Sequence, residues 1–377
     1  MAATVTWEAL RELAGFRAES GCALSIYLDL DPSDTPTPAG AETRLRSLLA
    51  RAEKEFAHGG ERPREEKMAV GRDLDRIREW WGREFDRDGA RGVAIFVSGG
   101  DGLWRVLMLP RAVRDDVHLS RRLRLTPLVD LAGDGEGALV AVVNRERGQV
   151  FRLRGGRLQE IVDRTEEQPA QHDQGGWSQA RFQRHIEKLV AEHLKAVGGE
   201  IDKRVRSTRG PELVIVAPDE LRAEIEGALS VEARESIVGW ANARANASPL
   251  ELLEVARPHL ERARTARIGE AVERWREERG RHARASAGWA ETLPAASDGR
   301  VDLLLLGEGA DRKAFRCPRC GRGEAEAGSC PLDGTQLEPD AGSDIAVQQT
   351  LVQGGSVATV RGDQLDDAEG VGALLRF

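Results

Sequence analysis

A polar loop that leads into a long amphipathic helix constrains this chain more than any other stretch. Residues 165–195 begin with a segment poor in apolar residues and reach the pair Gly175-Gly176, which Trp177 follows. Apolar residues then recur at helical spacing, which predicts a helix with one face packed on a core. Ser178 is the expected N-cap, because its hydroxyl can accept a hydrogen bond from the first turn. The apolar stripe comprises Phe182, Ile186, Leu189, Val190 and Leu194.

Basic residues lie mostly off this stripe, where solvent or phosphate groups would be. The glycines before the helix matter because a backbone without Cβ can approach a ligand closely. Glycine pairs are common in turns that have no function, so a plain loop-to-helix connection is the alternative. The basic residues after the helix either contact RNA phosphates or belong to a solvated loop. The predicted RNA-binding residues are Arg181, Arg184, Lys188, Lys203, Arg204 and Arg206.

Size and charge narrow the class of protein. A chain of 377 residues should hold two or three domains. The net charge of −8 argues against a general nucleic-acid coat, so any RNA contact must come from local basic faces. No run approaches the ~18 apolar residues of a membrane span. The N-terminus lacks a secretory apolar region. We therefore expect a cytoplasmic monomer that does not enter membranes.

Residues 1–131 predict a two-layer α/β domain. An alternating strand, two long helices and a pair of strands follow one another, so the helices should cover a small sheet. A short helix precedes them. The predicted elements are a helix at 5–16, a strand at 23–30, helices at 40–57 and 64–86, and strands at 92–98 and 103–109.

Residues 132–265 predict a second α/β domain. Near-continuous apolar runs at 139–143 and 212–217 are typical of buried strands. Further strands at 149–153 and 158–162, then the Gly-Gly loop and its helix, lie between them. A metal-dependent nuclease would need several converging carboxylates. Only Asp163 and Glu166 lie near a strand end, so nuclease activity is not favoured.

Residues 266–377 combine a strand at 301–306 with a cysteine-rich segment at 315–338. Cys317-Pro-Arg-Cys320-Gly has the spacing of a zinc knuckle, and Cys330-Pro-Leu-Asp333-Gly repeats it with a carboxylate in the fourth position. Zinc accepts thiolate and carboxylate ligands in tetrahedral structural sites. We predict a structural zinc ion; a ribbon that keeps its fold without metal is the alternative. Nothing nearby supplies a general base for catalytic zinc.

Three motifs carry a resemblance to a known family. Gly175 to Phe182 resembles the Gly-Gly-Gln loop and following Ser-Ala-x-Arg-Phe helix of archaeo-eukaryotic class-I peptide release factors and Pelota. Gly370 to Phe377 resembles the strand that closes their third domain, and the ribbon resembles an insertion in some members. The resemblance implies three domains: 1–131, an RNase-H-like domain at 132–265, and an α/β domain at 266–377 that carries the zinc ribbon.

The resemblance also implies a function. In the family, the tip enters the ribosomal peptidyl-transferase centre, where the glutamine helps place a water on the ester of peptidyl-tRNA. The corresponding catalytic residues here are Gly175, Gly176, Trp177, Ser178 and Gln179. Trp177 stands where the family has glutamine, and the first glutamine comes two residues later. The turn at 58–64 lacks the family's Asn-Ile-Lys-Ser motif, so stop-codon decoding is not expected.

The implied partners are the ribosome, with its rRNA and peptidyl-tRNA, and a translational GTPase. Our leading hypothesis is ester hydrolysis of peptidyl-tRNA in the A site, for peptide release or ribosome rescue. A non-catalytic Pelota-like rescue or hibernation factor is the alternative, and cleavage of tRNA itself is a third.

Overall fold

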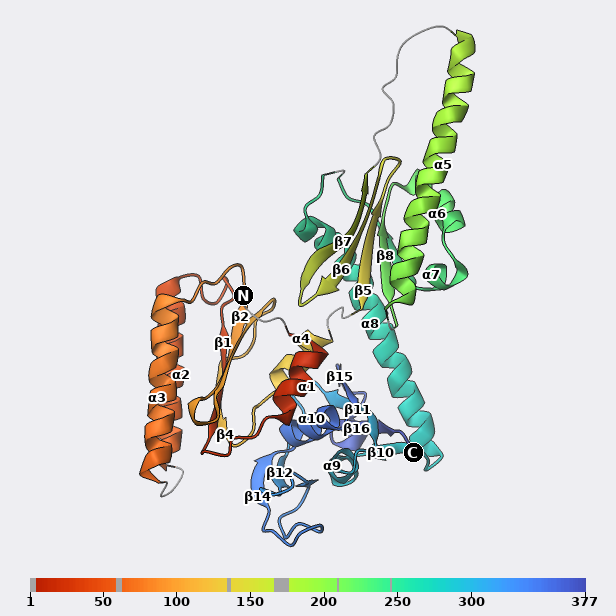
Figure 1. Ribbon diagram of the computed structural model, residues 1–377. Helices are drawn as coiled ribbons and strands as arrows, with labels where there is room; N and C mark the ends of the chain where they lie inside the picture. Colours follow the sequence, from red (N-terminus) through yellow and green to blue (C-terminus); the bar gives the residue numbers. More distant parts are fainter. Residues whose placement is uncertain (1–4, 59–62, 134–136, 166–175, 209, 245) are drawn as a thin grey trace. The chain divides into compact units, whose positions relative to one another are not determined.

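The computed structural model describes residues 5–58, 63–133, 137–165, 176–208, 210–244 and 246–377, with the backbone alone at 165 and 176–183. The chain divides into two compact units (Figure 1). Unit 1 comprises Met1–Asp134 and Glu270–Phe377, and unit 2 comprises Gly135–Gly269. Among the described helices, none combines the length and apolar content needed to cross a bilayer.

The N-terminal part of unit 1 is an antiparallel sheet between helices. The strand order is β3-β2-β1-β4. Alternate residues of β1 serve two cores: Leu24 and Ile26 pack toward α2 and α3, and Tyr27 packs toward α1. The predicted helices and strands are confirmed, and β4 was not predicted. The elements are α1 (Trp7–Gly15), β1 (Ala23–Asp29), α2 (Pro38–His58), α3 (Arg64–Arg83), β2 (Gly92–Ser98), β3 (Leu103–Leu109) and β4 (Asp116–Ser120).

The C-terminal part of unit 1 holds a second sheet and a small ribbon. The second sheet has the order β10-β16-β11-β15, with β11 and β15 parallel, and the ribbon has the order β13-β12-β14. Gly372 of β16 lets Trp275 approach closely, because an added Cβ would stand 2.7 Å from its ring. The elements are β10 (Ala285–Ala287), α9 (Trp289–Ser297), β11 (Val301–Gly307), β12 (Lys313–Arg316), β13 (Gly323–Glu324), β14 (Glu338–Ala341), α10 (Gly342–Val352), β15 (Ser356–Val360) and β16 (Val371–Leu375).

One apolar core joins the two ends of the chain in unit 1. It extends from α1 and the inner face of β1, through the segment after β4, to α9, α10, β11 and β16. This connecting segment contains η2 (Thr126–Leu128) and α4 (Val129–Ala132). Polar groups add to the contact: the Gln348 side-chain amide donates to the Leu123 carbonyl, and the Thr126 hydroxyl donates to Asp344. Residues far apart in the sequence therefore share one interior.

Unit 2 is a five-stranded mixed sheet with helices on both faces. The order is β7-β6-β5-β8-β9; β5, β6 and β7 are antiparallel, whereas β8 and β9 run parallel to β5. Helices α5, α6 and α7 pack on one face, and the first turns of α8 pack on the other. Both faces are buried, which explains the near-continuous apolar runs. The elements are β5 (Ala138–Val143), β6 (Arg147–Arg154), β7 (Arg157–Thr165), α5 (Gly176–Arg206), β8 (Glu212–Val216), η3 (Asp219–Leu221), α6 (Arg222–Ala228), α7 (Val231–Glu235), β9 (Ile237–Ala241) and α8 (Pro249–Gly280).

The bounds of α5 correct two predictions. The helix begins at Gly176, so Ser178 lies inside its first turn and the predicted N-cap is wrong. Several polar residues precede the apolar stripe, and such a sequence does not fix a helix end to the residue. Lys203, Arg204 and Arg206 lie in the last turns of α5 and not in a following loop. Cations are favoured there by the negative end of the helix dipole.

Candidate metal centre and projecting helix

Two turns of the ribbon repeat the same backbone geometry. In the first, the Cys317 N–H donates to the Arg322 carbonyl at 2.8 Å, and the Gly321 N–H donates to the Cys317 carbonyl at 2.9 Å. In the second, the corresponding bonds join Cys330 with Thr335 at 2.8 Å and Gly334 with Cys330 at 2.9 Å. Both glycines have positive φ, 83° and 72°, which side chains with a Cβ rarely adopt. Asp333 therefore occupies the position in the second turn that Cys320 occupies in the first.

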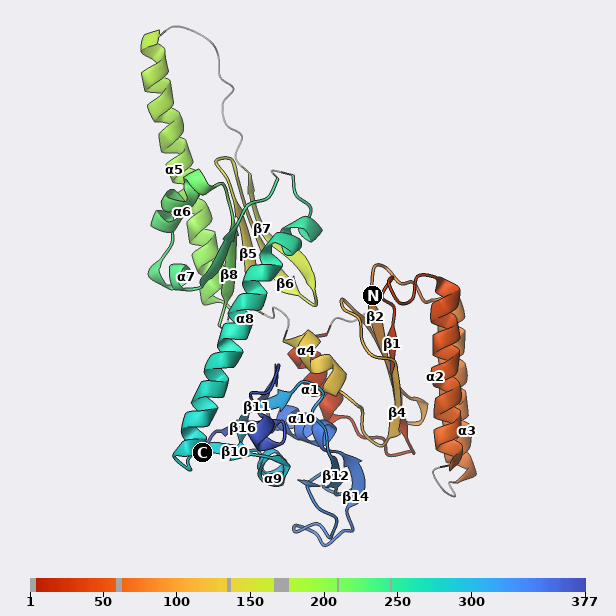
Figure 2. The same cartoon turned by 180° about the vertical axis from the view of Figure 1, so that it is seen from behind.

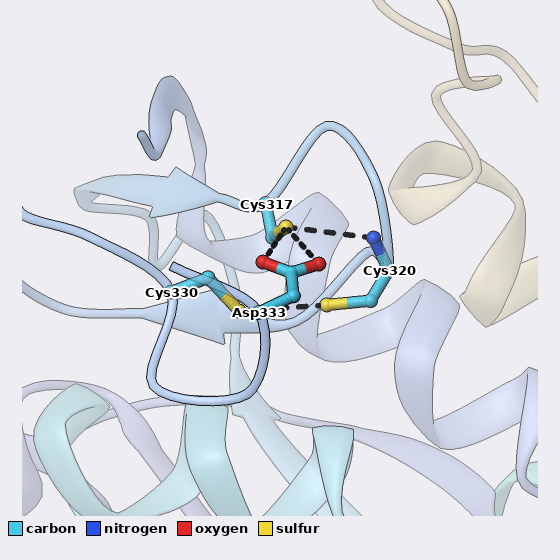
Figure 3. A group of neighbouring side chains, drawn as sticks. All are labelled: Cys317, Cys320, Cys330 and Asp333. Atoms are coloured by element: carbon cyan, nitrogen blue, oxygen red, sulfur yellow. Dashed lines mark hydrogen bonds between the residues drawn. The ribbon is translucent and has the colours of Figure 1, made fainter. Parts of the chain in front are cut away.

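The side chains of the two turns converge (Figure 3). The ligand atoms of Cys317, Cys320, Cys330 and Asp333 all lie within 4.8 Å of one another. The Cys320 and Cys330 sulfurs are 3.6 Å apart, and the Cys317 sulfur is 3.7 Å from each oxygen of Asp333. A tetrahedral zinc ion with bonds of about 2.3 Å places its ligand atoms about 3.8 Å apart. The cluster could hold a metal such as zinc.

Electrostatics in the cluster also suit a cation. Burial would raise the pKa of Cys317, but the backbone N–H groups of Cys320 and Arg319 outweigh it and lower that pKa below its ordinary value. Burial, with contributions from the Cys317 and Cys330 sulfurs, raises the pKa of Cys320 to about 11. The N–H of Thr335 lowers the pKa of Asp333. A dication would offset the repulsion among these ligands and favour their deprotonated forms.

Among the described side chains of α5, packing on the core of unit 2 begins at Ile186. The buried apolar side chains of the helix are Val190, Leu194, Val197, Ile201 and Val205, and the partly buried Ile186 precedes them. About 15 Å of helix separates Gly176 from Ile186 at 1.5 Å per residue. Figures 1 and 2 show this end of α5 extending beyond the sheet of unit 2.

Four of the five predicted catalytic residues, Gly176 to Gln179, belong to this projecting end. Gly175 lies outside the described residues. The backbones of Gly176, Trp177, Ser178 and Gln179 form the first turn of α5, and their side chains lie outside the described part.

The predicted RNA-binding residues form two groups along α5. Arg184 and Lys188 are exposed, whereas the side chain of Arg181 lies outside the described part. Lys203 and Arg206 are exposed at the other end of the helix, where Arg206 pairs with Glu232 at 3.3 Å. About 22 Å of helix separates Lys188 from Lys203. The structure therefore does not bring the two groups together. Arg204, in the second group, is half-buried, and His193, which lies between the two groups, is buried.

Three arginines that no sequence pattern singled out gather beside the ribbon. Arg17 follows α1, Arg122 follows β4, and Arg316 ends β12, and together they line one cleft. No spacing pattern links residues so far apart in the chain, and only the shared core of unit 1 brings them to one place.

The central segment decides the family. Residues 124–264, which include the whole of unit 2's sheet and α5, match bacterial archaeo-eukaryotic release factor family 10. Over these residues the chain is similar to the archaeo-eukaryotic release factors. The predicted resemblance is confirmed, and it covers the helix that carries the Gly-Gly tip.

Similar proteins agree with this assignment. Peptide chain release factor subunit 1 of Archaeoglobus fulgidus is 26% identical over 285 residues, which is 69% of this chain and 70% of that protein. The crystal structure of the archaeal termination factor aRF1 is 17% identical, with 98% and 96% of the two chains covered and a TM-score of 0.27. Archaeal Pelota in a ribosome-bound model with ABCE1 is 11% identical, with 100% and 95% covered and a TM-score of 0.37. These scores are low, so the sequence matches carry the assignment.

Proposed function

We propose that this release-factor-like protein acts on peptidyl-tRNA in the ribosomal A site, releasing the peptide by ester hydrolysis without reading a stop codon. The observation that carries the proposal is the projecting end of α5. Residues that resemble the family's catalytic tip form the start of a helix whose other end is anchored in a core. A tip of this kind can enter an RNA cavity while the rest of unit 2 stays folded.

The first turn of α5 offers suitable chemistry for the reaction. The first N–H groups of a helix have no acceptors within the helix, and the helix dipole makes this end positive. N–H groups between Gly176 and Ser178 would stabilise the oxyanion that forms when water attacks the ester. Gln179 would help to orient that water, and Trp177 would stack on a base of the tRNA end. Ribosomal RNA and tRNA would supply the remaining contacts.

The basic face of α5 would guide the tip along RNA. Arg184 lies in the projecting end and Lys188 follows shortly after it, and both side chains are exposed. Arg181 would extend this group, whereas Lys203, Arg204 and Arg206 would contact phosphates farther away. Such contacts position a protein on RNA without reading its sequence.

A peptide-release assay tests the proposal. Ribosomes that carry labelled peptidyl-tRNA should release peptide when the protein is added, and Gln179→Ala should reduce the rate at least about tenfold. Gln159→Ala is the matched control, because Gln159 is an exposed glutamine of β7 in the same unit. Equal rates for the two variants would remove Gln179 from the mechanism. A wild-type protein that binds ribosomes and releases nothing would refute hydrolysis.

A non-catalytic rescue or hibernation factor is the second candidate, and Trp177 in place of the family's glutamine favours it. Such a factor would sediment with ribosomes, particularly from stressed cells, and leave peptidyl-tRNA intact. Cleavage of tRNA is a third outcome of the same incubation, and sequencing of tRNA 3′ ends would detect it.

The proposal also includes three domains, a zinc ion and a protein partner. The sheet order of unit 2 supports an RNase-H-like domain at 132–265, between an N-terminal domain at 1–131 and a C-terminal domain at 266–377. A structural zinc ion would stabilise the ribbon at 315–338. A translational GTPase would deliver this cytoplasmic monomer to the ribosome; co-purification with such a GTPase in a nucleotide-dependent manner would test that partner.

A further inference from the structure

A cleft of about 370 Å³ in unit 1 lies between the end of β4 and the ribbon. Its wall includes Arg17, Ser120, Arg122, Arg316 and Pro318. The cleft belongs to neither the projecting helix nor the metal ligand set, although Cys317 contributes to its wall.

The arginines of this cleft are poorly neutralised. Arg316 is 7% exposed; its Nε pairs with Asp340 at 2.6 Å, but its buried Nη1 has no hydrogen-bond partner. Arg17 donates to the carbonyls of Pro318 and Arg319, which are neutral groups. The half-buried guanidinium of Arg122 lies against Gly321, where an added Cβ would be 2.8 Å from its Nη2. Within the described part of the chain, that guanidinium has no ion pair.

The carboxylates at the cleft do not complete the pairing. Asp340 already binds Arg316, and Glu66 accepts a hydrogen bond from the Cys22 thiol at 3.3 Å. Glu338 and the exposed Arg121 also line the wall. Among the described groups, Asp340 is the one carboxylate that pairs with any of these three guanidinium groups. Like charges held this close destabilise the folded state, so the arrangement favours a further, bound anion.

We propose that this cleft binds a phosphate group, held by Arg122 and Arg316 with Arg17 at its edge. Guanidinium groups from three separate segments approach one volume, and a tetrahedral phosphate can accept hydrogen bonds from several directions. A planar carboxylate is satisfied by one bidentate arginine. The phosphate belongs either to an RNA backbone or to a small phosphorylated compound. Because Cys317 and Pro318 form part of the wall, metal in the ribbon would keep the cleft in shape.

Calorimetry on the full chain with inorganic pyrophosphate tests this inference without ribosomes, so its outcome is independent of the peptide-release assay. Wild-type protein should bind pyrophosphate, and Arg122→Gln should weaken binding at least about tenfold. Arg361→Gln is the matched control, because it removes the same charge from an exposed arginine elsewhere in unit 1. Arg17→Gln, at the edge of the cleft, should have a smaller effect. Thermal unfolding of each variant verifies that it is folded.

A competition experiment distinguishes the two sources of the phosphate. If pyrophosphate displaces a labelled single-stranded RNA 10-mer, and Arg122→Gln weakens both ligands, the site binds an RNA backbone. If pyrophosphate binds and leaves the RNA in place, the site binds a small phosphorylated compound. Failure of the wild-type protein to bind pyrophosphate overturns the proposal, as do equal losses in Arg122→Gln and Arg361→Gln.

Discussion

The two units of this protein are formed from different kinds of chain segment. Unit 1 is assembled from both ends of the chain, and its polar groups bind one another across a shared core. Unit 2 is one continuous segment, and its helix α5 begins beyond the sheet that anchors it. In the folded chain, the ligand atoms of the ribbon in unit 1 already lie within 4.8 Å of one another. Under the proposed function, the tip of α5 would form a complete site only together with ribosomal RNA and tRNA.

Loss of a metal ligand should have the largest effect. It tests whether the ribbon of unit 1 binds a metal ion through its own four side chains. Cys330→Ser removes a buried ligand, so we expect zinc content to fall from about one ion per chain to near zero. The segment around β12, β13 and β14 should then lose protection in hydrogen exchange. Mass spectrometry of the metal and exchange of the ribbon amides measure the two effects. Cys22→Ser, which changes a thiol outside the cluster, should keep its zinc.

Shortening a buried side chain in the anchored part of α5 should have the next largest effect. Ile201 is fully buried in the core of unit 2, so Ile201→Ala should lower the free energy of unfolding by about 2–5 kcal/mol. Ile186 is only partly buried near the projecting half, and Ile186→Ala should lower it by about 1 kcal/mol. Urea unfolding of both variants measures how much more stability is lost at Ile201 than at Ile186. Equal losses would mean that the helix is anchored along its whole length, which would contradict the contrast between the units.

The protonation state of Asp344 should change the stability of unit 1 with pH. Burial raises the pKa of this carboxyl, and it outweighs the positive charge of Arg124, whose Nε is 3.4 Å away. The folded state therefore holds the proton more tightly than the unfolded state. The stabilisation by protonated Asp344 is fully present below the pKa of about 4 that the carboxyl has in the unfolded state. It is lost as the pH rises through the raised pKa of the folded state.

Asp344→Asn removes this titration, so the variant should gain stability relative to wild type as the pH rises. Unfolding in urea at pH values between about 4 and 7 measures this trend. Asp302→Asn, at an exposed aspartate of β11, should show no such trend. A wild-type-to-variant difference that stays constant with pH would show that Asp344 keeps one protonation state.

Removal of one exposed charge from α5 should have the smallest effect on folding. Lys188 is exposed and pairs with Glu192 at 3.7 Å, so Lys188→Ala should change stability by less than about 0.5 kcal/mol. Ribosome co-sedimentation should nevertheless weaken about two- to fivefold, with a reduced salt dependence. Lys54→Ala, at an exposed position of α2, is the control. If both variants sediment like wild type, Lys188 does not contact RNA.

Local patterns predicted much of what the structure contains. The alternation in β1, the apolar runs of β5 and β8 and the stripe of α5 each follow from the spacing of apolar residues. The knuckle repeat predicted that Asp333 would take the place of a fourth cysteine, and the two turns have the same hydrogen bonds. The start of α5 was misplaced, because polar residues before a helix compete as caps. Short elements such as β4 and β10 had no distinct pattern.

The sequence by itself determined which segments are helices and strands, where a metal could bind, and the family of the central segment. Spacing along the chain was sufficient because neighbouring residues carry those properties. Only the tertiary structure decided that the chain ends share a core, that Asp344 is buried beside Arg124, and that Arg17, Arg122 and Arg316 line one cleft. Such contacts join residues more than a hundred positions apart, and they depend on packing that no local pattern encodes.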